Sequence, residues 1–586
     1  MNARRMAVLA VIVLAFAAPL FLGGFAIALL NYVYLNAIVV VGLVLLTGVL
    51  GLISFGQAAF VGVGAYATAW VTVSMGASPW LGLPVAMGIA GVIALLVGAI
   101  TLRMGGHYLA IATLAWGISF YYLFGNLSGM GGFTGLGNIP APAIGGVQLT
   151  AERGMYWLIL AALAVTIWVC SNLLDSRIGR ALRAVRYGPA LAESFGINVP
   201  RLKLAVFVLS AMLAGLSGWL FAHLQGYINP SPFGVTISIE YLFMAVIGGA
   251  AALAGAIIGS GVVTLLREWL QDAMTAFIGQ AGNFEVIVFG VIMLVVLNRA
   301  KSGIWPFASR WLPVPQLARP KSNVAATQVG QLLSQEALLE VKGARKTFGG
   351  LVAVNGVSFS IGRGQILGLI GPNGAGKSTM FNLISGLLPL SAGEVQFRGQ
   401  RIDGMAPGAI AALGMSRTFQ HVKIVRNMSV LDNVALGAWR HTQTGFFKSG
   451  LRMDRREEQS VRSEAQWQLE RVGLADMYAA RAGSLALGKQ RILEIARALA
   501  SHPVLLLLDE PAAGLRALEK RALADLLIEL RKTGLAILLV EHDMDFVMQV
   551  TDHLVVMNFG EKLAEGVPAE IQKHPKVLEA YLGADE

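Results

Sequence analysis

The sequence predicts a polytopic α-helical transmembrane domain over residues 1–305, a linker at 306–336 and a soluble α/β domain over 337–586. Three observations predict this class. The chain of 586 residues is too long for a single core. It is 55% hydrophobic and only 13% charged, which is typical of a membrane protein. Apolar residues run almost without interruption to about Lys301, and charged residues then return at the density of a soluble protein.

Nine apolar runs in the first half approach the ~20 residues that cross a bilayer. They lie near residues 6–30, 33–53, 56–75, 81–102, 106–124, 155–174, 204–224, 236–262 and 282–298. Arg4 and Arg5 place the N-terminus in the cytoplasm, and the six basic residues of the 175–203 loop place that loop there too. The net charge of +11 has the same explanation, so we expect no nucleic-acid partner. Further spans follow the first run directly, so we expect a retained helix rather than a cleaved signal peptide.

The number of spans must be even if the soluble domain lies on the same side as the N-terminus. Three apolar runs follow the 175–203 loop, so one of them must split, re-enter or fail to span. We expect this of the run 236–262, because Gly248-Gly249 interrupts it and the spacing of Gly255 and Gly259 suits close helix packing. We therefore predict an even number of membrane-spanning helices, about eight to ten, with both termini in the cytoplasm.

The 175–203 loop predicts a short amphipathic helix. Arg180, Arg183 and Arg186 recur at helical spacing, and Gly188-Pro189 ends the pattern. Such a helix lies on the membrane surface or docks onto another domain. The soluble domain in the same chain favours docking, as a coupling helix.

Two polar residues interrupt the apolar half among glycines. Ser54 and Gln57 stand in a zone where polar side chains usually face a bundle interior or a cavity. Two interpretations are open, namely a wall of a solute path and ordinary helix packing.

The soluble half is organised around a phosphate loop, Gly371-Pro372-Asn373-Gly374-Ala375-Gly376-Lys377-Ser378-Thr379. An apolar strand-like run, 365–370, precedes it and a helix-like run follows. The glycines allow backbone N–H groups and the helix N-terminus to face an anion. Lys377 would reach the β- and γ-phosphates of ATP, and the Ser378 hydroxyl would bind Mg²⁺. The spacing and the flanks therefore predict a P-loop NTPase.

Other polar residues follow apolar runs in the same half. The run 504–508 ends in Asp509 and Glu510, and it reads as a parallel strand buried on both faces. Asp509 would hold Mg²⁺ through water, and Glu510 would act as general base on the attacking water. His542, after the run 536–540, is placed to sense the γ-phosphate, and Gln420 to join the metal and the water to the membrane half.

Together these residues resemble the nucleotide-binding domain of an ABC transporter over essentially all of 338–586. The finer resemblance is to the branched-chain amino acid uptake family. It is carried by Phe348-Gly-Gly350, Ser416-Arg-Thr-Phe-Gln420, Arg491-Ile-Leu-Glu-Ile-Ala-Arg497, Asp509-Glu-Pro-Ala-Ala-Gly-Leu515, Glu541-His-Asp-Met544 and Ala580-Tyr-Leu-Gly583. The membrane half resembles the family's permease through Leu46-Thr-Gly48, Gly62-Val-Gly-Ala-Tyr66, Gly179-Arg-Ala-Leu-Arg-Ala-Val-Arg186 and Gly196-Ile-Asn198.

The resemblance implies that Phe348 stacks on adenine, that Thr379 joins Lys377 and Ser378 at the phosphates and Mg²⁺, and that two such domains hold two ATP molecules head to tail. A signature at Leu485, Ala486 and Gly488 would face the ATP of the opposite domain. This signature, Leu485-Ala-Leu-Gly-Lys489, departs from Leu-Ser-Gly-Gly-Gln. Ala486 lacks the expected hydroxyl, but alanine is not unusual there in the branched-chain family, so Leu487 and Lys489 are the odder changes. Arg516 stands where Asp or Asn is typical. We therefore expect two ATP sites of unequal activity.

The resemblance also implies a function. It is ATP-driven import of branched-chain amino acids or related small polar solutes across the cytoplasmic (inner) membrane, by an ATP hydrolase fused to its permease. The implied partners are a second permease and a second ATP-binding subunit (or a second copy of this chain), a solute-binding protein and membrane lipid. The alternatives are an exporter half-subunit, which typically has six long helices and charge-rich loops, and a membrane-anchored ATPase that acts on another protein.

Overall fold

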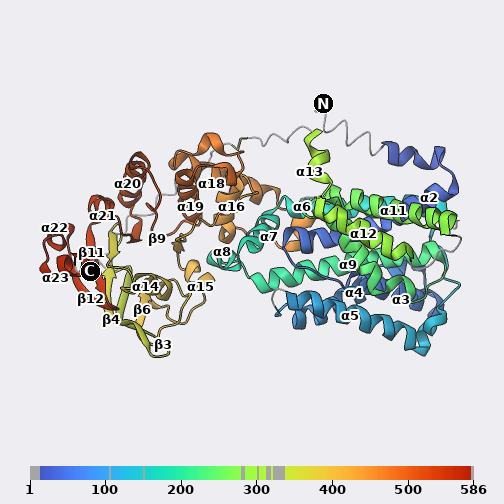
Figure 1. Cartoon of the computed structure of the whole chain (residues 1–586), viewed down its shortest axis with the longest axis horizontal. Coiled ribbons are helices and arrows are strands. Elements are labelled where there is room, and N and C mark those ends of the chain that lie inside the picture. Colours follow the sequence, from blue (N-terminus) through green and yellow to red (C-terminus); the bar gives the residue numbers. More distant parts are fainter. Residues whose placement is uncertain are drawn as a thin grey trace. The chain divides into compact units, whose positions relative to one another are not determined.

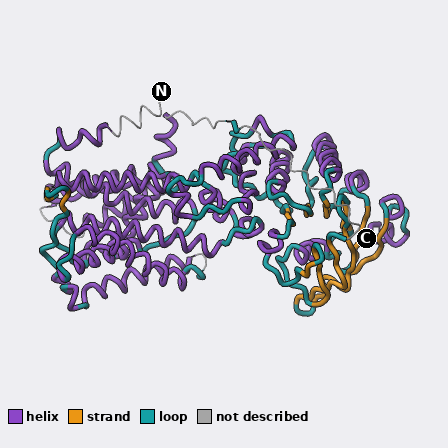
Figure 2. Tube along the Cα trace, turned by 180° about the vertical axis from the view of Figure 1, so that it is seen from behind, coloured by secondary structure: helices purple, strands orange, loops and turns teal. Residues whose placement is uncertain are grey.

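The computed structural model describes residues 13–104, 107–149, 152–278, 284–299, 303–311, 319–320 and 337–582. The chain divides into two compact units (Figure 1). The first comprises Met1–Asp175, Pro200–Pro315 and Ser449–Arg452, and the second comprises Ser176–Val199, Gln316–Lys448 and Met453–Glu586. Strands are concentrated in the second unit (Figure 2). Arg4, Arg5 and most of the expected linker lie outside the described residues.

The first unit is almost entirely helical. Its helices are α2 (Gly24–Leu43), α3 (Gln57–Ala69), α4 (Pro79–Thr101), α5 (His107–Asn126), α6 (Glu152–Leu174), α9 (Val199–Gln225), α10 (Val235–Gly249), α11 (Leu253–Ile278), α12 (Phe284–Arg299) and α13 (Trp305–Ala308). Strands β1 (Ala143–Ile144) and β2 (Val147–Gln148) form an antiparallel pair. The π-helical turns Val44–Val49 and Trp70–Ser74 extend α2 and α3.

Six helices in the described part of the chain are long and apolar enough to cross a membrane. They are Gly24–Val49, Pro79–Thr101, His107–Asn126, Glu152–Leu174, Val199–Gln225 and Leu253–Ala273. Two apolar helices are shorter, Val235–Gly249 and Ile287–Val296. The total of eight to ten spans stays a prediction, because length and composition alone do not fix which shorter helices cross.

The helix boundary expected between the first two apolar runs, at residues 31–32, is wrong. α2 continues through Asn31 and begins instead after Gly23. Asn31 is fully buried, and its amide donates a hydrogen bond to the backbone carbonyl oxygen of Glu152 at 3.0 Å. A polar residue that finds a partner on a neighbouring helix does not end its own helix.

The break expected within 236–262 is confirmed, because α10 ends at Gly249 and α11 begins at Leu253. The two helices then pack at their glycines. A Cβ on Gly248 would strike the carbonyl oxygen of Gly255, and one on Gly259 would strike that of Met244. Small residues are therefore required on both helices.

The second unit contains two sheets. The six-stranded sheet has the order β12-β11-β5-β10-β9-β8, and all neighbours are parallel except β11 and β12. Its strands are β5 (Ile366–Ile370), β8 (Met415–Arg417), β9 (Leu505–Asp509), β10 (Ala536–Val540), β11 (His553–Asn558) and β12 (Glu561–Gly566). The antiparallel sheet, in the order β4-β3-β6-β7, consists of β3 (Leu339–Phe348), β4 (Leu351–Ile361), β6 (Ala392–Phe397) and β7 (Gln400–Arg401).

The apolar run that predicted a buried strand is β9, and all of its residues are buried. Leu505 and Leu507 pack in one apolar cluster, whereas Leu506 and Leu508 pack in another. Alternate residues point to opposite faces of a strand, so both faces of this sheet are covered. The expected strands 365–370 and 536–540 are likewise confirmed as β5 and β10.

Helices surround these sheets. They are α7 (Arg177–Tyr187), α8 (Pro189–Ser194), α14 (Lys377–Ile384), α15 (Pro407–Ala412), α16 (Val430–Gly437), α17 (Phe446–Gly450), α18 (Arg455–Arg471), α19 (Leu487–Leu499), α20 (Ala517–Lys532), α21 (Met544–Val550), α22 (Pro568–Ile571) and α23 (Pro575–Leu582). The amphipathic helix predicted in the 175–203 loop is α7, and the Ser176 hydroxyl caps it by accepting a hydrogen bond from the N–H of Ile178. Gly188 and Pro189 end it as expected.

Candidate nucleotide site

The phosphate loop follows β5, in the interior of the six-stranded sheet. Gly371, Gly374 and Gly376 have φ angles of 150°, 81° and 97°, which favour glycine. A Cβ on Gly376 would lie 2.5 Å from the carbonyl oxygen of Ala353. The helix α14 begins at Lys377, directly after the loop. Backbone N–H groups at a helix N-terminus form a ready site for phosphate.

Lys377 is held by its own loop. Its Nζ donates hydrogen bonds to the carbonyl oxygens of Gly371 at 2.6 Å and Pro372 at 2.9 Å. Burial lowers the pKa of Lys377, and the charges of Glu510 and Asp509 oppose that shift. Around it, Asn373 and Ser378 are exposed, Thr379 is half-buried and Ala375 is buried. The ammonium is thus positioned between the loop and two carboxylates.

Asp509 closes β9 with a buried carboxylate. The residue is 5% exposed, and its Oδ1 has no hydrogen-bond partner among the described residues. Burial raises the pKa of Asp509 to about 6, although the nearby Arg417 charge acts in the opposite direction. A hard cation such as Mg²⁺ would satisfy an unpartnered carboxylate oxygen. The residues present therefore fit the expected metal.

Glu510 and His542 follow neighbouring parallel strands, so they emerge at the same edge of the sheet. The Glu510 carboxylate lies 3.9 Å from His542 Nδ1. Glu510 has a φ of 47°, and its N–H donates to the carbonyl oxygen of Val540 at 2.8 Å. A non-glycine residue in the left-handed region is strained, and such residues cluster at functional sites.

Glu541 lies between these two loops and was given no role from the sequence. Its buried carboxylate accepts hydrogen bonds from the N–H groups of Ala512 at 2.6 Å and His542 at 3.0 Å. Ala512 belongs to the loop after Glu510, so Glu541 joins the two loops. One signal in the sequence could have identified Glu541: a carboxylate directly after a buried strand must accept hydrogen bonds from nearby groups, and backbone N–H groups of the adjoining loops are available.

Gln420 and Phe348 lie in exposed positions. The backbone carbonyl oxygen of Gln420 accepts a hydrogen bond from the Arg491 guanidinium at 2.7 Å, while the residue itself is exposed. Phe348 ends β3 and is 46% exposed, with Lys346 Nζ 5.2 Å from its ring centroid. An exposed aromatic face at a strand end is available for stacking.

The signature residues begin α19. Ala486 is the N-cap and is exposed, and no side-chain hydrogen bond caps the helix there. Leu485 and Gly488 are buried. A Cβ on Gly488 would lie 2.5 Å from the Glu519 carboxylate, which accepts a hydrogen bond from the Arg516 N–H at 2.9 Å. Two of the departures from the family pattern, Ala486 and Arg516, thus both lie at helix N-termini.

The α7 helix packs within the second unit, so of the two placements expected for it, on the membrane surface or docked onto another domain, it adopts the second. Arg180 is 3% exposed and donates two hydrogen bonds to Glu458 on α18, at 2.7 and 2.9 Å. The Arg177 guanidinium lies 3.8 Å from the centroid of the Trp439 ring. Arg183 is half-buried and Arg186 is exposed. The partners Glu458 and Trp439 gave no signal in the sequence, because neither belongs to a motif.

Ser54 and Gln57 are buried in the first unit, at the start of α3. Both the Nε2 and the Oε1 of Gln57 lack a hydrogen-bond partner within the described structure, and the residue is 0% exposed. Ser54 Oγ accepts a hydrogen bond from the Gly56 N–H at 3.4 Å. A buried amide with two unsatisfied atoms is costly, and such groups are usually met by water or a ligand.

Family models match both halves of the chain. Residues 25–297 match the permease component of the branched-chain amino acid transport system, and residues 354–513 match the ABC transporter model. Residues 561–586 match the model of the branched-chain amino acid ATP-binding cassette transporter.

The relatives cover the ATPase half. The high-affinity branched-chain amino acid transport ATP-binding protein LivG of Salmonella typhimurium is 43% identical over 252 residues, which are 42% of this chain and 98% of LivG. BraF of Pseudomonas aeruginosa, a protein of the same description, is 42% identical over 250 residues, again 42% of this chain and 98% of BraF. A nucleotide-free ATP-binding cassette of known structure is 32% identical and covers 42% of this chain and 99% of that chain, with a TM-score of 0.38.

The fold and the site define an ABC transporter subunit, an ATPase that couples ATP hydrolysis to transport and is joined to a membrane-embedded helical domain. The chain belongs to the branched-chain amino acid family of ABC transporters, and it carries the permease and the ATP-binding part in one polypeptide.

Proposed function

We propose that this chain imports branched-chain amino acids, or related small polar solutes, across the cytoplasmic membrane at the expense of ATP. The observation that carries the proposal is a branched-chain permease region and an ATP-binding cassette region in one chain. The names of LivG and BraF support the same solute class. The match to the permease component of a transport system favours an importer over the two alternatives, an exporter half-subunit and a membrane-anchored ATPase that acts on another protein.

At the ATP site we assign roles to the residues around the phosphate loop. Lys377 and the N-terminus of α14 bind the β- and γ-phosphates, together with the rest of the loop and Thr379. Mg²⁺ would be held by Ser378, Asp509 and Gln420. Its positive charge would stabilise the negative charge that develops on the transferred phosphoryl group. Glu510 accepts the proton of the attacking water, and His542 contacts the γ-phosphate. Phe348 stacks on the adenine.

The signature residues serve the ATP held by another ATPase domain. That domain belongs to a second subunit or a second copy of this chain, and a solute-binding protein delivers the solute. The start of α19, which carries Leu485, Ala486 and Gly488, faces that nucleotide. Arg180, Arg183 and Arg186 on α7 transmit closure of the ATPase domains to the spans.

Reconstituted vesicles test the function. The vesicles hold this chain and its companion subunits and are supplied with binding protein. They should accumulate radiolabelled leucine only when ATP is present on the side of the membrane that the ATPase domain faces. Glu510→Gln should reduce accumulation and ATP hydrolysis roughly a hundredfold or more, because a general base contributes ~10²–10⁴-fold. Glu579→Gln, at an exposed glutamate on α23, is the matched control and should act as wild type. Leucine accumulation without ATP, or undiminished in Glu510→Gln, would refute the proposal.

A further inference from the structure

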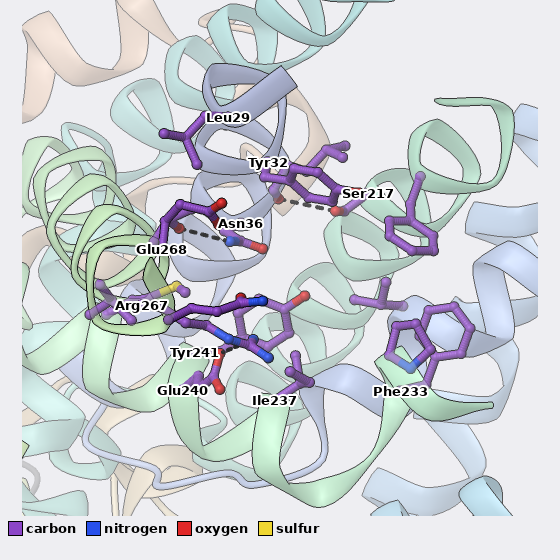
Figure 3. Close-up of a pocket in the computed structure, with 18 residues that line it drawn as sticks. Leu29, Tyr32, Asn36, Ser217, Phe233, Ile237, Glu240, Tyr241, Arg267 and Glu268 are labelled. Carbon is purple, nitrogen blue, oxygen red and sulfur yellow. Dashed lines mark hydrogen bonds and ion pairs between the residues drawn. The ribbon is translucent and has the colours of Figure 1, made fainter. Parts of the chain in front are cut away.

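The first unit contains a partly open cavity of about 280 Å³ between α2, α10 and α11 (Figure 3). Each of these helices contributes residues three or four positions apart, so each turns one face toward the cavity. Those that carry the argument are Tyr32, Asn36, Ile237, Glu240, Arg267 and Glu268. α3 contributes Val61, which lies one turn after Gln57.

Both signs of charge meet in this cavity. Arg267 Nη1 lies 3.1 Å from Glu240 Oε2, and the two side chains are 49% and 11% exposed. Glu268, next to Arg267 on α11, is half-buried and also lines the cavity. On the facing helix, Asn36 Nδ2 donates a hydrogen bond to Thr264 Oγ1 at 3.2 Å.

The opposite face of α11 has a different character. Val262, Leu265 and Trp269 are 37%, 54% and 63% exposed. These apolar side chains suit lipid, so α11 in a membrane would turn its polar stripe away from lipid and into the cavity. Ionisable residues within a span are expensive and usually mark a solute or ion path.

An ion pair that only fastened α10 to α11 would not explain the space beside it. Helix contacts are normally packed without voids much larger than a water molecule. A cavity of this volume has room for several water molecules, and therefore for one small solute.

We propose that this cavity is a solute site of the permease and that it takes a zwitterionic α-amino acid with an aliphatic side chain. The inference rests on the proposed import function and names the residues that perform it. The Arg267 guanidinium matches the geometry of a carboxylate, and the carboxylates of Glu240 and Glu268 receive the ammonium group. Ile237 and Phe233 (Figure 3) form the apolar wall for the side chain, together with Val61 of α3.

The test uses a diazirine analogue of leucine, which labels what it touches on illumination. The full chain in vesicles with its companion subunits is labelled, digested and mapped by mass spectrometry. Label should appear on the peptides of α3 and α10 and on residues 231–233, which carry the apolar wall, and excess leucine should reduce it roughly tenfold or more. Isoamylamine, which lacks the carboxylate, and 4-methylpentanoate, which lacks the amine, should compete poorly.

Variants separate a solute site from a structural ion pair. Arg267→Gln should reduce labelling roughly tenfold or more, since it removes a charged partner of the carboxylate. The control Arg299→Gln, at an exposed arginine on α12, should label as wild type. Ile237→Ala removes part of the apolar wall and so enlarges the space for the solute side chain. In this variant phenylalanine should compete with the label better than it does in the wild type, and leucine less well. A misfolded protein would not produce that gain, so this variant keeps the test informative if Arg267→Gln does not fold.

ATP-driven leucine uptake by the same vesicles distinguishes the two proposals. Uptake with the expected labelling supports both. Uptake by the wild type with no competed label on these helices, or with unchanged labelling in Arg267→Gln and Ile237→Ala, overturns the site and leaves the import function standing. Competed label on these helices without ATP-driven uptake supports the site and overturns the import function.

Discussion

Arg180 on α7 and Glu458 on α18 form a bidentate ion pair that is almost completely buried, with N···O distances of 2.7 and 2.9 Å. Paired hydrogen bonds between a guanidinium and a carboxylate fix orientation as well as distance. The segment that links α6 to α9 is thereby held to the helices of the second unit.

Removal of one partner of this pair should uncouple ATP hydrolysis from transport. Arg180→Gln removes the two short hydrogen bonds to the buried Glu458 carboxylate and leaves Arg462, whose Nε lies 4.0 Å from Oε2. Loss of one partner of a buried pair costs up to ~3–5 kcal/mol. We expect solute uptake to fall roughly tenfold or more, and uptake per ATP hydrolysed to fall with it. The double variant Arg180→Glu with Glu458→Arg should restore part of the uptake. Arg456→Gln, at an exposed arginine on α18, is the control. Wild-type coupling in Arg180→Gln would remove α7 from the mechanism.

Substitution of Asp509 should lower the ATPase activity but raise the stability of the nucleotide-free protein. Its pKa of about 6 in the folded chain lies above the ~3.9 of unfolded aspartate. Between these values the folded state binds more protons, so the free energy of unfolding falls as the pH rises through this window. Above pH ~6 the ionised carboxylate therefore destabilises the nucleotide-free chain, by on the order of 3 kcal/mol.

Asp509→Asn should accordingly raise the Tm of the nucleotide-free protein at pH 8, and the gain should shrink as the pH is lowered toward 4. The same variant should lose Mg²⁺-dependent ATP hydrolysis. The neighbouring charges of Arg417, Glu510, Arg491 and Glu541 stay in place. Asp525→Asn, at an exposed aspartate on α20, should leave the pH dependence of Tm unchanged. A Tm below that of the wild type at every pH would show that Asp509 stabilises the fold.

Gly259 and Gly261 on α11 form a matched pair. A Cβ on Gly259 would strike the backbone carbonyl oxygen of Met244, which cannot move without moving α10. Gly259→Ala should therefore lower the Tm by an amount equivalent to ~1–3 kcal/mol. A Cβ on Gly261 would lie 3.9 Å from its nearest neighbour, Val33. Gly261→Ala should be neutral or raise the Tm, because alanine is favoured by ~0.5–1 kcal/mol in a helix interior. Equal effects of the two substitutions would show that α10 and α11 do not pack through Gly259.

Much of the second unit was predictable because its signals are local. The runs at 365–370, 504–508 and 536–540 are continuously apolar because both faces of their sheet are buried. The glycines of the phosphate loop mark backbone conformations that other residues rarely adopt. Parallel strands then bring Asp509 and Glu510 to the same edge as the loop without any further information.

What the sequence did not predict depends on partners far away in the chain. Asn31 suggests a helix end until it is seen bonded to Glu152. Glu458 is one of many glutamates, and only the docking of α7 distinguishes it. The cavity residues Glu240 and Arg267 lie on two helices, separated by the break after Gly249, and periodicity along one helix does not report a pairing between two.

Ala486 offers a test of the unequal-site hypothesis, because a serine there should have two separable effects. Ala486 caps α19 with φ and ψ of −61° and 153° but supplies no side-chain acceptor. A serine hydroxyl would accept a hydrogen bond from the first turn of the helix and stabilise the chain by ~0.5–2 kcal/mol. The same hydroxyl has a proton left to donate. In the assembled dimer it would donate to the γ-phosphate of the opposite ATP, and hydrogen bonds to charged groups are worth ~1.5–3 kcal/mol.

Ala486→Ser should therefore raise the Tm without nucleotide and also lower the ATP concentration that half-saturates hydrolysis, roughly tenfold. Ala479→Ser, at an exposed alanine outside a helix cap, should change neither quantity. Thermal unfolding and ATPase titrations measure the two effects separately. A raised Tm with an unchanged ATP dependence would mean that the start of α19 stabilises only its own domain. The missing hydroxyl would then not account for unequal sites, and Leu487, Lys489 and Arg516 would be the remaining departures to test.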